Sequence, residues 1–103
     1  MSGAAQLEQQ GPGRWRVSGE LSFATVPELA RAGMQMLAGT DPVEVDLGGV
    51  RRSDSAGVAL LVEWLRQARQ RGVELRYSHL PEQMRNIIRV AGLDRILPVD
   101  SAA

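Results

Sequence analysis

The alternation of apolar and polar residues along the chain predicts several short strands. Over residues 14–21, Trp15 and Val17 alternate with arginine and serine, which is the period-2 pattern of a strand with one buried face. The segment VEVDL at 43–47 is the clearest strand, and VELRYS at 73–78 alternates in the same way. A weaker strand at 4–10 precedes the turn signal GPG.

Three other segments have the apolar spacing of amphipathic helices. The first covers about residues 25–37, where Thr25 and Glu28 have the spacing of a capping box. The second covers about residues 55–70, and the third begins at the proline of residue 81 and covers about 81–91. A glycine follows the second helix closely and another follows the third directly, as expected for helix ends.

The order of these elements is β-β-α-β-α-β-α, which predicts an α/β fold. Strands separated by helices are expected to pair in parallel, whereas the first two strands form an antiparallel hairpin. Three helices are too few to cover both faces of a sheet. We therefore expect a small mixed β-sheet of about four to five strands, with about three helices packed mainly on one face.

The middle helix is more apolar than a helix that buries only one side. Its apolar arc is centred on Leu61 and spans roughly 200°, against the roughly 100° that a one-sided surface helix needs. One interpretation is a central helix that contacts both the sheet and a neighbouring helix. The other is that an edge of the arc, at Trp64 or Val62, contacts a partner protein.

Composition narrows the possible classes of protein. The 103 residues are 44% hydrophobic and carry a formal net charge of zero, which fits one domain and argues against a general nucleic-acid or membrane-surface footprint. The absence of cysteine excludes disulfides, thiolate metal sites and a cysteine nucleophile. The first ten residues do not have the pattern of a signal peptide, and no apolar run of about 18 residues occurs, so we expect neither a leader nor a membrane span. We expect a soluble cytoplasmic protein.

The motif Asp-Ser-Ala-Gly at 54–57 lies directly in front of the middle helix and is the main candidate for chemistry. Its serine could be a nucleophile, a phosphorylation site or a helix cap. A serine hydrolase needs a general base, and the only histidine, His79, lies at a strand end with no identifiable partner. No phosphate-binding or dinucleotide-binding glycine motif is present, and the carboxylates are scattered. We expect no enzymatic activity, no metal and no cofactor.

Two interpretations of Ser55 stay open at this point. Serine and aspartate are preferred immediately before a helix, where such a cap contributes roughly 1 kcal/mol. A helix N-terminus is equally a place where a phosphate is stabilised by unpaired N–H groups and the helix dipole. The neighbouring Arg51 and Arg52 either attract an acidic surface or remain solvated.

Taken together, these segments resemble the STAS domain family. Three elements carry the resemblance: a strand ending in Asp-Leu, then Asp-Ser-x-Gly opening a long helix, then a further strand and a helix ending in Gly-Leu. The segment VSGELSFATVPEL is similar to the family's Gly-Glu-Leu segment. The resemblance covers about residues 14–99 and implies a single STAS domain over residues 1–103.

The resemblance points to two subclasses. Anti-sigma factor antagonists are phosphorylated on the serine of Asp-Ser-x-Gly, here Ser55, which controls their binding to an anti-sigma kinase. The second subclass is the cytoplasmic STAS subunit of the Mla ABC transporter, which traffics phospholipids between the membranes of Gram-negative bacteria and maintains outer-membrane lipid asymmetry. The segments ALLVEWLRQARQRG, LPEQMRNIIRVAGL and ILPV are similar to that subunit. This resemblance implies binding to the ATPase subunit, and through it to the permease, at the cytoplasmic face of the inner membrane, without membrane insertion.

One departure favours the transporter subclass. Antagonists commonly carry an aspartate soon after Gly-Glu-Leu, whereas Ser22 and Phe23 follow it here. An apolar Phe23 near the same end of the sheet as Ser55 suits a protein-contact surface, although burial is an equal alternative. The predicted partner-contact region comprises Arg51, Arg52, Ser53, Asp54, Ser55, Ala56, Gly57 and Phe23.

Overall fold

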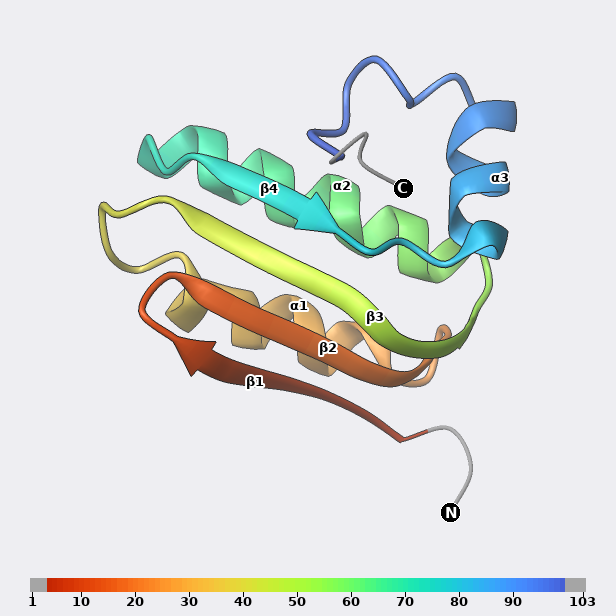
Figure 1. Cartoon of the computed structure of the whole chain (residues 1–103), viewed down its shortest axis with the longest axis horizontal. Helices are drawn as coiled ribbons and strands as arrows, with labels where there is room; N and C mark the ends of the chain where they lie inside the picture. Colours follow the sequence, from red (N-terminus) through yellow and green to blue (C-terminus); the bar gives the residue numbers. More distant parts are fainter. Residues whose placement is uncertain (1–3, 100–103) are drawn as a thin grey trace.

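The structure, a computed structural model, describes residues 4–99 and has the element order that the sequence predicts (Figure 1). Each strand and helix expected from the hydrophobic pattern is present, with changes at some boundaries. The elements are β1 (Ala5–Gly11), β2 (Arg14–Leu21), α1 (Val26–Met36), β3 (Val43–Ser53), α2 (Ser55–Arg71), β4 (Leu75–Ser78) and α3 (Glu82–Val90).

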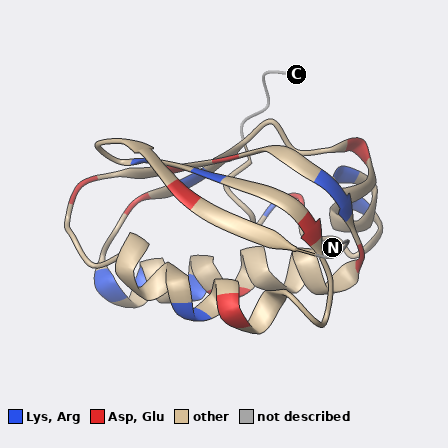
Figure 2. Cartoon of the chain, turned by 90° about the horizontal axis from the view of Figure 1, so that it is seen from below, with Lys and Arg blue, Asp and Glu red and all other residues tan. Residues whose placement is uncertain are grey.

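The four strands form one mixed sheet in the order β1-β2-β3-β4. The hairpin of β1 and β2 is antiparallel, whereas β2–β3 and β3–β4 are parallel pairs. Figure 2 shows the sheet from its edge, with helices packed against one of its faces. The predicted α/β class, the mixed sheet and the one-sided helices are confirmed.

Strand β3 is longer than the sequence predicts. It continues through both glycines of the GGV segment to Ser53, instead of ending at Leu47. Its pairing with β2 shifts register twice, between Arg16 and Ser18 and again at Glu20, so that β3 contains extra residues at both places. Such bulges let a strand absorb extra residues without losing its partner. As a result, β3 runs directly into the start of α2.

Helix α2 lies in the centre of the structure, and Trp64 joins it to α1. The Trp64 side chain is fully buried, and its indole N–H donates a hydrogen bond to the carbonyl of Leu29 at 3.2 Å. The indole lies so close to Gly33 that a Cβ there would overlap it. The central-helix interpretation of the wide apolar arc is therefore confirmed. The partner-contact interpretation is wrong for Trp64, although Val62 remains 37% exposed.

The charged side of α2 faces away from the sheet, as the helical pattern predicts. The Arg66 guanidinium donates two hydrogen bonds to the Glu63 carboxylate, at 2.6 and 3.0 Å, and Gln67 donates a third at 3.0 Å. The bonds from Arg66, followed by the bond from Gln67, lower the pKa of Glu63 to about 2. This pair lies on the surface, so its contribution to folding is small.

Strand β4 begins two residues later than expected because residues 72 and 73 complete the end of α2. Gly72 adopts a left-handed conformation, and the Val73 N–H donates to the Ala68 carbonyl at 2.9 Å. Further along β4, the buried Tyr77 hydroxyl donates to the Leu61 carbonyl at 2.7 Å. Burial raises the pKa of Tyr77 well above its ordinary value.

The capping box predicted for α1 does not form. Thr25 is the N-cap residue, but its side chain makes no capping hydrogen bond. Its hydroxyl instead accepts from the Ser22 N–H at 3.0 Å and donates to the Glu20 carbonyl at 2.9 Å. Thr25 therefore fixes the turn between β2 and α1. None of the helices among residues 4–99 has the length and hydropathy needed to span a membrane.

Candidate functional site

The predicted site lies where several elements meet at the start of α2. The carboxyl ends of the parallel strands β2 and β3 lie side by side at one end of the sheet, and α3 begins beside them (Figure 1). In open α/β sheets, the region outside the carboxyl ends of the strands is the usual place for binding. A cavity of about 300 Å³ opens here. It is lined by Glu20, Leu21, Ser22, Arg52, Ser53, Asp54 and Gln83.

Asp54, rather than Ser55, caps α2. Its backbone is extended, and its carboxylate accepts a hydrogen bond from the Ala56 N–H at 2.8 Å. The Asp54 N–H donates to the carbonyl of Leu21 at 3.2 Å, which ties the helix start to the end of β2. The cap interpretation of Ser55 is therefore wrong, because the aspartate one residue earlier already fills that position.

Ser55 is the first residue of α2, and its side chain is exposed. Within residues 4–99, no other residue forms a hydrogen bond with its hydroxyl. A negatively charged group at this position would lie beside the positive end of the helix dipole. The geometry is thus compatible both with contact to a partner and with phosphorylation, and it leaves the choice between them open.

The motif's glycine is required by close packing beneath Ser55. A Cβ on Gly57 would overlap the Ser53 hydroxyl and lie 3.0 Å from the Cβ of Leu21. The Ser53 side chain is only 1% exposed, and its hydroxyl donates to the Asp54 carbonyl at 2.9 Å. The first turn of α2 therefore lies directly against the ends of β2 and β3.

Three residues of the predicted contact region are buried. Ser53, Ala56 and Gly57 face the interior, so their side chains support the surface from below and do not form it. This corrects the prediction for these three residues. The cause is that the helix begins against the sheet and turns one side of the motif inward. The exposed members of the region are Phe23, Arg51, Arg52, Asp54 and Ser55.

Phe23 is 77% exposed in the loop between β2 and α1, so the burial alternative is wrong. It directly follows Ser22, which lines the cavity beside Asp54. Gln83 of α3, which the sequence does not predict to be part of the site, also lies here, and its side-chain oxygen accepts from the Ser53 N–H at 3.3 Å. No local pattern marks Gln83, because this contact joins segments 30 residues apart.

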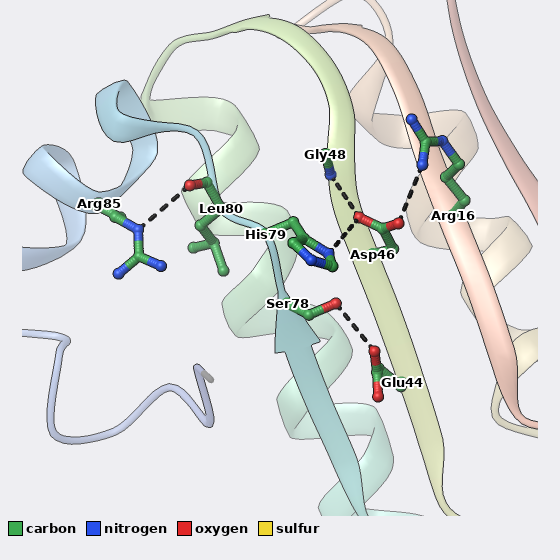
Figure 3. Close-up of polar contacts among 8 residues, drawn as sticks. All are labelled: Arg16, Glu44, Asp46, Gly48, Ser78, His79, Leu80 and Arg85. Carbon is green, nitrogen blue, oxygen red and sulfur yellow. Dashed lines mark hydrogen bonds and ion pairs between the residues drawn. The ribbon is translucent and has the colours of Figure 1, made fainter. Parts of the chain in front are cut away.

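His79 has a partner that the sequence does not reveal. It follows β4 with a left-handed backbone (φ 57°), and its ring Nδ1 lies 3.1 Å from the Asp46 carboxylate (Figure 3). That carboxylate also accepts from the Gly48 N–H at 2.7 Å and from Arg16 at 3.0 Å. The adjacent Ser78 hydroxyl donates to Glu44 instead, at 3.1 Å. His79 therefore belongs to a polar network on the sheet, on a different element from Ser55.

Comparison with known proteins identifies the family. A family model described as "Mlab, STAS domain" matches residues 4–98. The chain belongs to the STAS domain family. The resemblance inferred from the sequence is confirmed, and the matching model is the one that carries the name of MlaB, the STAS subunit of the MlaFEDB complex.

Solved and curated relatives fall into both expected subclasses of STAS domains. A chain of the Acinetobacter MlaFEDB complex in an ATP-bound conformation is 29% identical, with a TM-score of 0.75, over 84% of this chain and 93% of that one. An anti-sigma-B factor antagonist of Staphylococcus epidermidis is 33% identical over 82% of this chain and 80% of the relative. An anti-sigma factor antagonist from Mycobacterium paratuberculosis shares the fold, with a TM-score of 0.78 at 21% identity over 99% of this chain and 92% of that one.

Within residues 4–99, no group of three or more histidine or acidic side chains is placed to hold a metal ion. The site at the start of α2 offers a different chemistry. It combines an exposed hydroxyl, an exposed aromatic ring, Arg52 and a polar cavity above closely packed residues, whereas Arg51 lines a separate pocket with Gln6 and Arg16. Aromatic and arginine side chains are the types enriched where proteins bind one another.

Proposed function

We propose that this chain is the non-catalytic STAS subunit of an ABC-type phospholipid transport system that maintains outer-membrane lipid asymmetry. In this role it binds the cytoplasmic ATPase subunit, supports its assembly and activity, and lies at the cytoplasmic face of the inner membrane. The observation that carries the proposal is the match of the MlaB family model to residues 4–98. The likeness to a chain of the MlaFEDB complex supports it.

The ATPase contact is proposed at the exposed part of the helix start. Phe23 supplies an apolar side chain that is 77% exposed, and Ser55 supplies a hydroxyl without a partner among residues 4–99. Asp54 and Gly57 hold this surface in place, because the cap and the close packing leave the first turn little freedom. A surface ordered before binding loses less entropy when a partner docks.

Co-purification tests this proposal. The tagged chain, expressed in its own cell, is expected to retain an ABC ATPase and a permease. Phe23→Ser is expected to weaken ATPase retention, because it removes the exposed aromatic ring. Val90→Ser is the matched control, since Val90 is 86% exposed but lies near the far end of α3 from Gln83. Recovery of a kinase without an ABC ATPase would contradict the proposal.

The second candidate is an anti-sigma factor antagonist in a phosphorylation-controlled partner switch. The 33% identity to the Staphylococcus epidermidis antagonist and the exposed hydroxyl of Ser55 favour it. Under this hypothesis, a partner kinase and ATP phosphorylate Ser55, and Ser55→Asp abolishes kinase binding. Under the transporter hypothesis, no kinase phosphorylates Ser55, and Ser55→Ala weakens ATPase binding because it removes a hydroxyl of the proposed contact. Phosphate incorporation that persists in Ser55→Ala would exclude Ser55 as the modified residue.

A further inference from the structure

The two edges of the sheet differ in how their backbone is covered. At the β4 edge, the Tyr77 N–H donates to the Pro98 carbonyl at 2.9 Å, and Val99 forms a parallel bridge with Tyr77. The β1 edge has no such cover from residues 4–99. Figure 1 shows β1 at the outer margin of the sheet, with no helix beyond it. Within residues 4–99, one edge is therefore covered at Tyr77 by the chain's own segment, whereas the other presents a strand of seven residues without such cover.

The antiparallel ladder determines which backbone groups of β1 face outward. The Glu20 N–H donates to the Ala4 carbonyl at 3.1 Å, so this opposed pair is a hydrogen-bonded pair. Hydrogen-bonded and non-bonded pairs alternate along an antiparallel ladder. The backbone groups of residues 6 and 8 therefore face β2, and those of Ala5, Leu7 and Gln9 face away from the sheet.

This edge carries few of the features that usually protect an exposed strand. Charged side chains, lysine above all, proline and β-bulges commonly block edge-to-edge pairing. The β1 sequence AQLEQQG contains no lysine, arginine or proline and one charged residue, Glu8, and its register shift lies at its end, between Gln9 and Gly11. The edge is therefore chemically open to a further strand.

We propose that β1 pairs antiparallel with β1 of a second copy of this chain, about a two-fold axis at Leu7. In this register, Ala5 of each copy faces Gln9 of the other, and the outward backbone groups of all three outward residues are paired. Gln6 of each copy faces Glu8 of the other, which places an amide donor beside a carboxylate. The result is one continuous sheet of twice the width with a self-complementary interface.

The strand's own sequence selects this register over its neighbours. An axis at Glu8 would place the two Glu8 carboxylates directly opposite one another, and like charges in that position are destabilising. An axis at Gln6 would place Gln9 opposite residue 3 of the other copy, outside the described residues. Among registers that pair described residues only, the axis at Leu7 pairs Ala5, Leu7 and Gln9 together and places Gln6 beside Glu8 without opposed like charges, so the strand is complementary to a second copy of itself.

This inference does not rest on the proposed function. The start of α2 lies at the ends of β2 and β3, whereas the interface uses the outer side of β1. A dimer formed in this way carries two copies of the surface around Ser55. The dimer can therefore be tested with the purified chain alone, and failure of either proposal leaves the other standing.

A cysteine-pairing experiment tests the register directly, because the natural chain contains no cysteine. Gln6 and Glu8 are both exposed, so Gln6→Cys and Glu8→Cys leave the core unchanged. In the proposed dimer, position 6 faces position 8 of the other copy, at the spacing that suits a disulfide. An equimolar mixture of the two variants is expected to form a cross-linked dimer on mild oxidation. Either variant alone is expected to remain uncross-linked.

Charge substitution at Gln6 tests the interface without any cross-link. Gln6→Glu creates two like-charge pairs with Glu8 of the other copy and is expected to weaken dimerisation about fivefold. Gln6→Arg, at the same exposed site, is expected to strengthen it by a similar factor. Sedimentation velocity across a concentration series measures both. A chain that stays monomeric at every concentration overturns the proposal, as does a dimer that responds to neither substitution or a mixture that does not cross-link.

Discussion

Replacement of Gly57 by alanine is the most direct test of how the Asp-Ser-x-Gly motif is built. In the structure, the added Cβ overlaps the Ser53 hydroxyl and lies 3.0 Å from the Cβ of Leu21. Both neighbours are buried, Ser53 at 1% and Leu21 at 2% exposure, so neither side chain can turn away into solvent. The substitution therefore forces the first turn of α2 away from the sheet.

The size of the effect follows from two opposing contributions. Alanine in place of glycine within a helix stabilises the folded state by roughly 0.5–1 kcal/mol. Insertion of a methyl group into a packed interior costs typically about 1–3 kcal/mol. The overlap with Ser53 decides the sign, because that side chain is anchored by its hydrogen bond to the Asp54 carbonyl. We expect a net loss of about 1–2 kcal/mol in the free energy of unfolding.

Denaturant unfolding of a double-mutant cycle measures this contribution. Ser53→Ala removes the overlapped oxygen, so Gly57→Ala is expected to cost about 1 kcal/mol less in that background than in the natural chain. Gly39→Ala is the matched control, because nothing lies within 4 Å of a Cβ at that position. We expect Gly39→Ala to be neutral or slightly stabilising.

Two results would contradict this account of the motif. A Gly57→Ala variant as stable as the natural chain would show that the helix start is not closely packed against the sheet. An equal loss with and without the Ser53 hydroxyl would show that the side-chain overlap is not the cause. In the latter case, the need for glycine would lie in the backbone rather than in the contact with β3.

Three further substitutions test other parts of the structure. Asp54→Ala, which removes the helix cap, is expected to lower the unfolding free energy by about 1 kcal/mol, whereas Ser55→Ala should change it by less than about 0.5 kcal/mol; equal losses in denaturant unfolding would contradict the assignment of the cap. Burial raises the pKa of Tyr77, so stability is fully present below its unfolded pKa of about 10 and falls as the pH rises above it. Tyr77→Phe should therefore flatten the alkaline limb of a stability–pH curve, at a loss of about 1 kcal/mol near neutral pH; an unchanged limb would refute this. The pKa of Glu63 is lowered to about 2, so its contribution is present above its ordinary value of 4.5 and is lost as the pH falls through about 2. Glu63→Gln should make the acid limb shallower by less than about 1 kcal/mol, because the pair with Arg66 is exposed; a larger change would show a buried role.

The hydrophobic pattern alone predicts the element order, the α/β class and the wide apolar side of α2. These features are local, because a period of two or 3.6 residues is determined by which side of a strand or helix is buried. The Asp-Ser-x-Gly motif and its ordered neighbours also suffice for the family, which the match over residues 4–98 confirms. Gly72 ends α2 in the left-handed conformation that a glycine at that position predicts.

Only the tertiary structure decides which motif residues face outward. Ser53 and Ala56 are polar or small and carry no local sign of burial, yet they lie inside because α2 begins directly against β2 and β3. The contact between Asp46 and His79 is likewise absent from any local pattern, because it joins a residue of β3 to one 33 residues later, just after β4. Sequence periodicity reports the buried side of one element, whereas these contacts depend on where two elements meet in space.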